Sequence, residues 1–235
     1  MKQPGKHSVL QSIRDFLSGC PNNKFLVAVS GGLDSMVLAD ALLKHTADFA
    51  IAHCNFHLRR KDSDEDQKLV EDWAASHGIV CHIGHFPLSD LKSGIQESAR
   101  NARYQFFEEL KAQYGYEILL TAHHSDDLQE TFILNLIRGA GLRGLDVLSS
   151  TDKYSLRPFR DLQKKENLGY ARAQGLRRRE DASNLKDDYA RNKLRNQVFP
   201  ILREIKPGLG SSMLQTMELI SEWRMYMDQR LSLWK

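Results

Sequence analysis

Short runs of apolar, β-prone residues alternate along this chain with longer segments in which apolar residues recur at helical spacing. Such alternation is typical of βαβ units, in which helical crossovers join parallel strands. The expected strands are, in chain order, residues 24–29, 49–54, 79–86 and 117–122. The expected helices are residues 35–45, 63–77, 95–114 and 125–137. The pattern therefore predicts an α/β fold with a Rossmann-like, doubly wound and mostly parallel sheet flanked by helices.

The pattern changes in the last third of the chain. After Pro158 it becomes helical and basic, and the segment from Ser211 to Trp234 is apolar at helical spacing with no strand after it. We therefore expect an α/β domain over residues 1–205, followed at 206–235 by the start of a helical C-terminal segment.

Composition adds a basic half to this picture. With 235 residues, 41% of them apolar, the chain can bury one substantial core. The formal net charge is only +3, but residues 154–206 carry fourteen Lys and Arg against seven Asp and Glu. This half offers a surface suited to nucleic acid, although runs of charge are often only solvated faces.

The cysteines and the N-terminus indicate the compartment. Cys20, Cys54 and Cys81 are widely spaced and form no C-x-x-C pair, so neither a disulfide framework nor a zinc ribbon is expected. No apolar run resembles a signal peptide or could cross a bilayer. We expect a soluble, cytoplasmic protein without a membrane partner.

The first expected strand runs directly into a turn rich in glycine and serine, and the first expected helix follows. The turn consists of Ser30, Gly31, Gly32, Leu33, Asp34 and Ser35. Glycines let the backbone approach an anion closely, and a helix N-terminus directs N–H groups and partial positive charge toward it. The turn is therefore predicted to bind phosphate, with the two serines as hydroxyl donors. The alternative is an ordinary βα loop with a good helix cap.

No lysine follows these glycines, which disfavours the γ-phosphoryl transfer of Walker-type proteins. An acid, Asp34, stands there instead. A carboxylate beside a phosphate is repulsive unless a divalent cation lies between them, so Asp34 is predicted to help hold Mg²⁺.

A second group of polar residues spans 121–131, where the fourth expected strand becomes a helix. Open parallel sheets bind their ligands at such strand ends. Asp127 and Glu130 lie three residues apart and so share a helix face, where they could complete a metal site or clamp a cationic substrate. Helix capping by Ser125 and the acids after it is the alternative. His123 and His124 have no partner at zinc-site spacing, so stacking on a purine or plain packing is expected of them.

The S-G-G-x-D-S turn after an apolar strand resembles the PP-loop ATP pyrophosphatases. Members of that class cleave ATP between the α- and β-phosphates and form an adenylated substrate. The resemblance implies ATP as a substrate and AMP and pyrophosphate as products.

Further segments resemble one branch of this class, the tRNA(Ile)-lysidine synthetases, over about residues 24–203. Residues 53–59 are similar to its H-x-N-H-x-L-R segment, and residues 99–104 match its A-R-x-x-R-Y helix. Its remaining motifs follow in the same order at residues 121–145, 157–159, 180–184 and 191–200. One departure is Phe56, where the family usually has histidine; His57 is displaced by one position, so neither is assigned a catalytic role.

The resemblance implies that the wobble cytidine of an isoleucine tRNA with a CAU anticodon is adenylated and then attacked by free L-lysine. ATP would be bound by residues 30–35 and His123, with Mg²⁺ at Asp34. Arg103 would stabilise charge at the α-phosphate, and Asp127 and Glu130 would bind the lysine. Contacts to tRNA are expected from Arg59, Arg191 and Arg195. The family usually carries further C-terminal domains, and a homodimer is compatible with the sequence.

Two rival functions are open. A tRNA thiolase of the same fold would activate a base identically but deliver sulfur, typically through paired cysteines. A non-catalytic nucleotide-binding regulatory protein would not need three acids, Asp34, Asp127 and Glu130, around a phosphate.

Overall fold

The computed structural model describes residues 8–45, 48–57, 61–86, 95–148, 155–177 and 189–232. The chain forms two compact units, each built from separate stretches of sequence. The sheet unit comprises His7–Ala122 and Tyr154–Glu180. The helical unit comprises Met1–Lys6, His123–Lys153 and Asp181–Lys235. Neither unit begins or ends at residue 205, and the domain boundary expected there stays a prediction.

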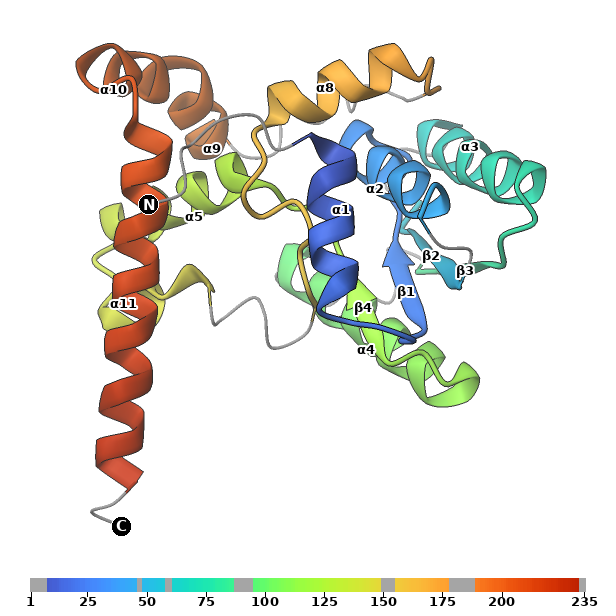
Figure 1. Cartoon of the computed structure of the whole chain (residues 1–235), viewed down its shortest axis with the longest axis horizontal. Coiled ribbons are helices and arrows are strands. Elements are labelled where there is room, and N and C mark those ends of the chain that lie inside the picture. Colours follow the sequence, from blue (N-terminus) through green and yellow to red (C-terminus); the bar gives the residue numbers. More distant parts are fainter. Residues whose placement is uncertain are drawn as a thin grey trace. The chain divides into compact units, whose positions relative to one another are not determined.

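The sheet unit contains a four-stranded parallel sheet with the order β3-β2-β1-β4 (Figure 1). Its strands are β1 (Phe25–Ala28), β2 (Phe49–Asn55), β3 (Cys81–His85) and β4 (Ile118–Leu120). Val27 at the centre of β1 is in register with Ile51 of β2 and Leu120 of β4. The chain turns back across the sheet between β3 and β4, so the doubly wound fold predicted from the sequence is confirmed.

Helices cover both faces of this sheet. They are α1 (Val9–Ser18), α2 (Leu33–Leu43), α3 (Lys61–Ser76), α4 (Ile95–Tyr114) and α8 (Lys164–Ala173). Side chains alternate between the faces along each strand. Val27 and Ile51 therefore join the core beneath α1, α2, α3 and α8, whereas Leu26 joins the core beneath α4.

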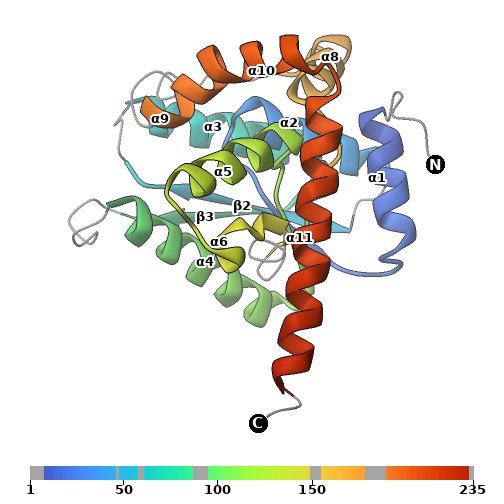
Figure 2. The ribbon, with the colours of Figure 1, turned by 90° about the vertical axis from the view of Figure 1, so that its left-hand side faces the viewer.

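The helical unit contains no strand within its described residues (Figure 2). Its helices are α5 (Ser125–Ile137), α6 (Leu142–Leu145), α9 (Tyr189–Lys193), the π-helical η3 (Leu194–Val198), α10 (Phe199–Ile205) and α11 (Leu209–Ser232). Its core joins Leu128 and Phe132 of α5 to Met213 and Met217 of α11. Beside this core, Arg224 of α11 forms an ion pair with Asp146, which is fully buried.

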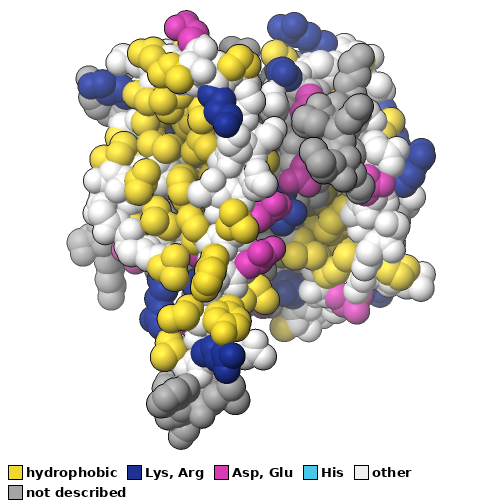
Figure 3. Space-filling model, turned by 60° about the vertical axis from the view of Figure 1, so that its left-hand side comes forward, with side chains coloured by type: hydrophobic (Ala, Val, Ile, Leu, Met, Phe, Trp, Pro, Cys, Tyr) yellow, Lys and Arg dark blue, Asp and Glu magenta, His cyan; other side chains and the backbone are white. Residues whose placement is uncertain are grey.

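The outer half of α11 leaves apolar side chains exposed. The space-filling view shows apolar side chains gathered on this face (Figure 3). Those exposed on α11 include Leu219, Trp223, Met225 and Tyr226.

Most expected elements are found, and a few differ. The helices expected at 95–114 and 125–137 have those bounds as α4 and α5. The helix expected from residue 63 begins at Lys61, so its expected cap at Asp62 or Ser63 falls within its first turn. The helix α1 was not predicted; Ser8 caps it by accepting a hydrogen bond from the Gln11 N–H. Within the described residues, no helix is both long and apolar enough to cross a membrane.

Candidate active site

The turn from Ser30 to Ser35 in the sheet unit joins β1 to α2, as expected. Gly31 has φ +86°, a left-handed conformation that side chains other than glycine rarely adopt. A Cβ atom at Gly31 would also lie only 3.3 Å from the backbone oxygen of Asp66 in α3. Both facts require glycine at this position.

Both predicted hydroxyl donors brace this turn. The Ser35 Oγ accepts a hydrogen bond from the Ser30 N–H at 3.2 Å and donates to the Gly32 carbonyl at 3.0 Å. The Ser30 Oγ accepts from the Gly32 N–H at 3.3 Å. The hydroxyls therefore fix the backbone in place, and the first turn of α2 has N–H groups without helical acceptors, which can receive an anion.

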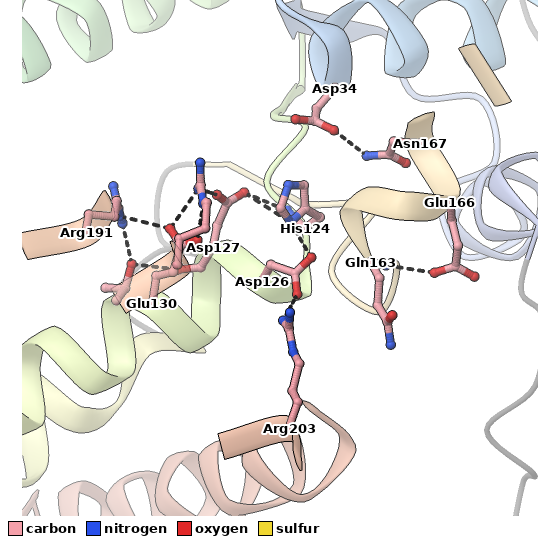
Figure 4. Close-up of polar contacts among 12 residues, drawn as sticks. Asp34, His124, Asp126, Asp127, Glu130, Gln163, Glu166, Asn167, Arg191 and Arg203 are labelled. Atoms are coloured by element: carbon pink, nitrogen blue, oxygen red, sulfur yellow. Dashed lines mark hydrogen bonds and ion pairs between the residues drawn. The ribbon is translucent and has the colours of Figure 1, made fainter. Parts of the chain in front are cut away.

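Asp34 lies half-buried in the first turn of α2 and contacts a residue of α8, which comes much later in the sequence. Asn167 of α8 donates from Nδ2 to the Asp34 Oδ1 at 2.7 Å (Figure 4). Asn167 is completely buried, and its Oδ1 has no hydrogen-bond partner among the described residues. No sequence motif indicated Asn167, because 133 positions separate it from Asp34.

The α8 helix holds Asn167 against α2 through local and tertiary contacts. The Glu166 carboxylate caps α8 by accepting the Gln163 N–H at 2.7 Å. One turn after Glu166, the Tyr170 hydroxyl donates to the Asp40 carboxylate of α2 at 2.7 Å. Asn167 therefore projects from a helix that is fixed on both sides of it.

Asp34 offers the kind of ligand that Mg²⁺ prefers, which is a carboxylate oxygen. The described residues contain no cluster of three or more His, Cys, Asp or Glu that would enclose a metal ion. Magnesium sites in nucleotide enzymes commonly use one or two carboxylates, with phosphate oxygens and water as the other ligands. The residues at this turn fit a Mg²⁺ ion that arrives with a nucleotide.

Arg103, the residue predicted to act at the α-phosphate, is exposed on α4. Its Cζ lies 5.4 Å from the centre of the Phe56 ring. Phe56 follows β2 and is buried, and its ring stacks on Phe86, which follows β3, at 5.0 Å. An aromatic pair at the ends of two strands thus supports the guanidinium group.

The helical unit contains the second predicted group of acids, and arginines neutralise it (Figure 4). Glu130 on α5 is 1% exposed. Both of its carboxylate oxygens accept from Arg195 of η3, at 2.7 and 2.9 Å. Arg191 of α9 lies 3.3 Å from the same carboxylate. Two of the three predicted tRNA contacts, Arg191 and Arg195, therefore touch one of the two predicted lysine-binding acids.

Asp127 is the more accessible of these two acids. Its side chain is 26% exposed, against 2% for Glu130. It accepts a hydrogen bond from the His124 N–H at 3.1 Å and so helps cap α5, whose N-cap is His124 and not Ser125. It lies 3.9 Å from Arg195.

The charge state of the cluster follows from these contacts. Burial lowers the pKa of Arg195, but its hydrogen bonds to Glu130 and the nearby carboxylates outweigh this, and the net shift raises the pKa. The guanidinium therefore stays charged at all working pH values. The two hydrogen bonds from Arg195 offset part of the cost of burying the Glu130 carboxylate.

The remaining predicted residues are placed as follows. His123 is exposed at the start of the helical unit, whereas His124 is buried. Arg59 lies outside the described residues. The phosphate turn, Asp34 and Arg103 belong to the sheet unit, and Asp127 and Glu130 belong to the helical unit.

Comparison with known proteins places these features in a family. The profile of the PP-loop domain matches residues 5–202. The chain is 37% identical over 202 residues to a tRNA(Ile)-lysidine synthase of Bacteroides thetaiotaomicron, covering 83% of this chain and 47% of the relative. It is 33% identical over 230 residues to the tRNA(Ile)-lysidine synthase of Bacillus subtilis, covering 91% of this chain and 48% of the relative. The chain thus spans about half the length of these relatives.

A solved structure supports the fold. A U34-tRNA thiolase from Methanococcus maripaludis, which contains a [4Fe-4S] cluster, superposes with a TM-score of 0.74. The match covers 91% of this chain and 78% of that chain at 18% identity. At this identity the likeness concerns the fold alone.

Proposed function

Because the chain belongs to the PP-loop family of ATP-using enzymes, we propose that it is the catalytic part of a tRNA(Ile)-lysidine synthase. In the proposed reaction, the carbonyl oxygen of the wobble cytidine attacks the α-phosphate of ATP, and pyrophosphate leaves. The amine of free lysine then attacks the adenylated carbon, loses a proton and displaces AMP.

One observation carries the proposal. Relatives that are 31 to 37% identical over more than four fifths of this chain share the name tRNA(Ile)-lysidine synthase. The phosphate turn and the acids at the start of α5 lie within the matched region.

The turn from Ser30 to Ser35 is proposed to bind the phosphates of ATP through backbone N–H groups at the start of α2. Asp34 would hold Mg²⁺, which, when bound, neutralises charge on the leaving pyrophosphate. Arg103 would stabilise the negative charge that develops at the α-phosphate. His123 is proposed to stack on the adenine.

Lysine is proposed to bind at Asp127 and Glu130. Asp127 is the more exposed carboxylate, so it is the better placed to receive an ammonium group and to accept the proton that the attacking amine loses. Both carboxylate oxygens of Glu130 accept hydrogen bonds from Arg195, so Glu130 would fix the positions of the charged side chains around it.

The tRNA is proposed to contact Arg59, Arg191 and Arg195. Arg191 has the more exposed side chain of the two that are described, at 38% against 28%. Phosphate contacts by such groups should give an affinity that falls with rising salt concentration.

Two of the three cysteines, Cys54 and Cys81, are poorly suited to the thiolase alternative. Burial raises the pKa of Cys54 to about 12 and that of Cys81 to about 11. A thiolate is the form that attacks sulfur donors and binds metal clusters, and these thiols are protonated at neutral pH. They are poor candidates for sulfur transfer.

The experiment supplies the chain with ATP, Mg²⁺, isoleucine tRNA and labelled lysine. We expect release of AMP and pyrophosphate, and label that precipitates with the tRNA, only when all four are present. Asp34→Asn should abolish AMP release and leave tRNA affinity nearly unchanged. Transfer of labelled sulfur instead of lysine, or ATP that stays intact with all components present, would show that the proposal is wrong.

A further inference from the structure

Asn167 is a buried polar residue that the proposed mechanism does not use. A buried polar group without a full set of hydrogen bonds destabilises the folded state. Asn167 is completely buried, and its Oδ1 has no hydrogen-bond partner among the described residues. Leucine would fill a similar volume without this cost. Packing alone therefore does not explain an asparagine at this position.

The Nδ2 group of the Asn167 amide explains why asparagine occupies this position. Its Nδ2 donates to the Asp34 Oδ1 at 2.7 Å, and the close-up shows the two side chains directed toward each other (Figure 4). A hydrogen bond to one carboxylate oxygen fixes the rotation of the carboxylate and leaves its other oxygen to accept a different partner. Groups that orient metal-binding carboxylates in this way tune the affinity for the ion.

We propose that Asn167 is a positioning residue that orients the Asp34 carboxylate for the magnesium ion of bound ATP. The inference rests on the proposed function only in that Asp34 serves a Mg²⁺–nucleotide site. It adds that the Asn167 amide on α8 sets the orientation of a metal ligand on α2, the Asp34 carboxylate. The Glu166 cap and the packing of Ala171 in the core hold α8 in place, so the Asn167 amide has a defined position.

The test measures binding of α,β-methylene-ATP to the full chain by calorimetry, with Mg²⁺ and again with EDTA. The variant is Asn167→Leu, which keeps the volume and removes the donor. We expect the affinity in Mg²⁺ to fall about 10- to 100-fold, as is usual for such orienting groups. We expect the affinity in EDTA to stay unchanged, because the backbone N–H groups of the turn are intact. The Tm should be unchanged or higher, because a buried unpaired acceptor is removed.

Two further variants make the result specific. Tyr170→Phe removes a different hydrogen bond between α8 and α2, the one to Asp40, while its ring stays packed against the core and the Asn167–Asp34 contact is kept. It should bind the analogue as the wild type does in both conditions. Asn167→Ala removes the donor without adding apolar bulk, and should lose the same Mg²⁺-dependent affinity.

The outcomes separate this inference from the proposed function. An equal loss of affinity in Mg²⁺ and in EDTA would mean that Asn167 only supports the fold, and would overturn the inference. So would wild-type affinity in both Asn167 variants. Failure of the wild-type protein itself to bind the analogue would overturn the proposed function, and this inference with it. If the Asn167 variants lose affinity for the analogue only in Mg²⁺, but the wild-type protein transfers no lysine, the inference would hold and the proposed function would be wrong.

Discussion

At the scale of single residues, Phe56 gives Arg103 a defined position on an otherwise open helix surface. The guanidinium lies 5.4 Å from the centre of the Phe56 ring, within the range of a cation–π interaction. Such contacts contribute about 0.5 to 1 kcal/mol at exposed sites. The aromatic ring of Phe56 therefore has a structural role in this chain.

We expect Phe56→Leu to slow pyrophosphate release about two- to fivefold, the rate equivalent of the cation–π energy. Leucine retains the apolar contact with Phe86 but has no aromatic face, so Arg103 would sample more positions. The KM for lysine should not change. The measurement is the rate of pyrophosphate release at saturating substrates. Phe56→Tyr, which keeps the ring, should retain the wild-type rate, and equal losses in both variants would contradict the prediction.

The half-buried thiol of Cys54 should make stability depend on alkaline pH. Burial raises its pKa to about 12 from an ordinary value of 9.0, although the charge of Arg103 opposes the shift. Below pH 9 the thiol is protonated in both states. Above pH 9 the unfolded chain loses this proton and the folded chain keeps it up to about pH 12, so the free energy of unfolding falls with rising pH.

Urea denaturation at about pH 8 and about pH 10 tests this dependence, since one pKa unit corresponds to about 1.4 kcal/mol. We expect Cys54→Ala to lose less stability than the wild type between these two pH values. The comparison of the two proteins removes the contribution of lysines and tyrosines that titrate in the same range. Identical losses would mean that Cys54 ionises in the folded protein as it does in the unfolded chain.

The residues of the site differ in how far the sequence could predict them. The turn from Ser30 to Ser35 was predictable because strand, glycines and helix are adjacent, and the structure has them in that arrangement. The contacts of Asp34 with Asn167 and of Glu130 with Arg195 join residues 133 and 65 positions apart. Neither contact leaves a periodic or local signal, so the sequence indicated the acids but not what orients them.

At the scale of elements, prediction succeeded where the signals that start and stop an element are local. The helix α4 has charged and apolar residues at helical spacing over its whole length, and α5 begins at the polar cluster after β4; both bounds were predicted. The π-helical turn η3 was not predicted. Pro200 follows it and cannot donate a backbone hydrogen bond, a frequent cause of such local changes in helix geometry.

The long helix α11 should depend on its ion pair with the segment that follows α6. Arg224 pairs with Asp146, which is 0% exposed. Removing one member of a buried pair leaves an uncompensated charge and typically costs about 3 to 5 kcal/mol. We expect Arg224→Ala to lower the free energy of unfolding by an amount near the lower end of that range, measured by urea denaturation.

A matched variant on the same helix controls for helix propensity. Arg230 is exposed and contacts only the ring and hydroxyl of Tyr226 in the described structure. Arg230→Ala should change stability by a few tenths of a kcal/mol at most, as is usual for exposed surface positions. A loss similar to that of Arg224→Ala would show that the buried pair is not what holds α11.

At the scale of the whole molecule, the parallel sheet was predictable but the division into units was not. Alternating strands and helices indicated a doubly wound sheet, and the order β3-β2-β1-β4 agrees with it. The helical unit takes α5 from the middle of the chain and α11 from its end. That association depends on long-range packing of Met213 and Met217 against α5, which no periodicity in the sequence reveals.

This packing makes a prediction about the boundary expected at residue 205. A chain that ends at Ile205 would keep β1 to β4 but lose Met213 and Met217 from the core that contains Leu128 and Phe132. Burying one such side chain contributes about 1.5 to 3 kcal/mol. We therefore expect the shortened chain to keep a protease-resistant sheet unit but to be cleaved rapidly within α5 and α10, as mass spectrometry of the fragments would show.

A second shortened chain tests whether loss of Met213 and Met217 is the cause of the expected protease sensitivity. Ending at Met227 removes only the exposed tip of α11 and keeps Met213, Met217 and Arg224, so this chain should resist protease as the full chain does. If the chain ending at Ile205 were equally resistant, residues 1–205 would fold without α11, and the sequence-based boundary would be a true folding boundary. If both shortened chains were cleaved rapidly, the last turn of α11 would contribute to stability, and the packing of the two methionines would not suffice.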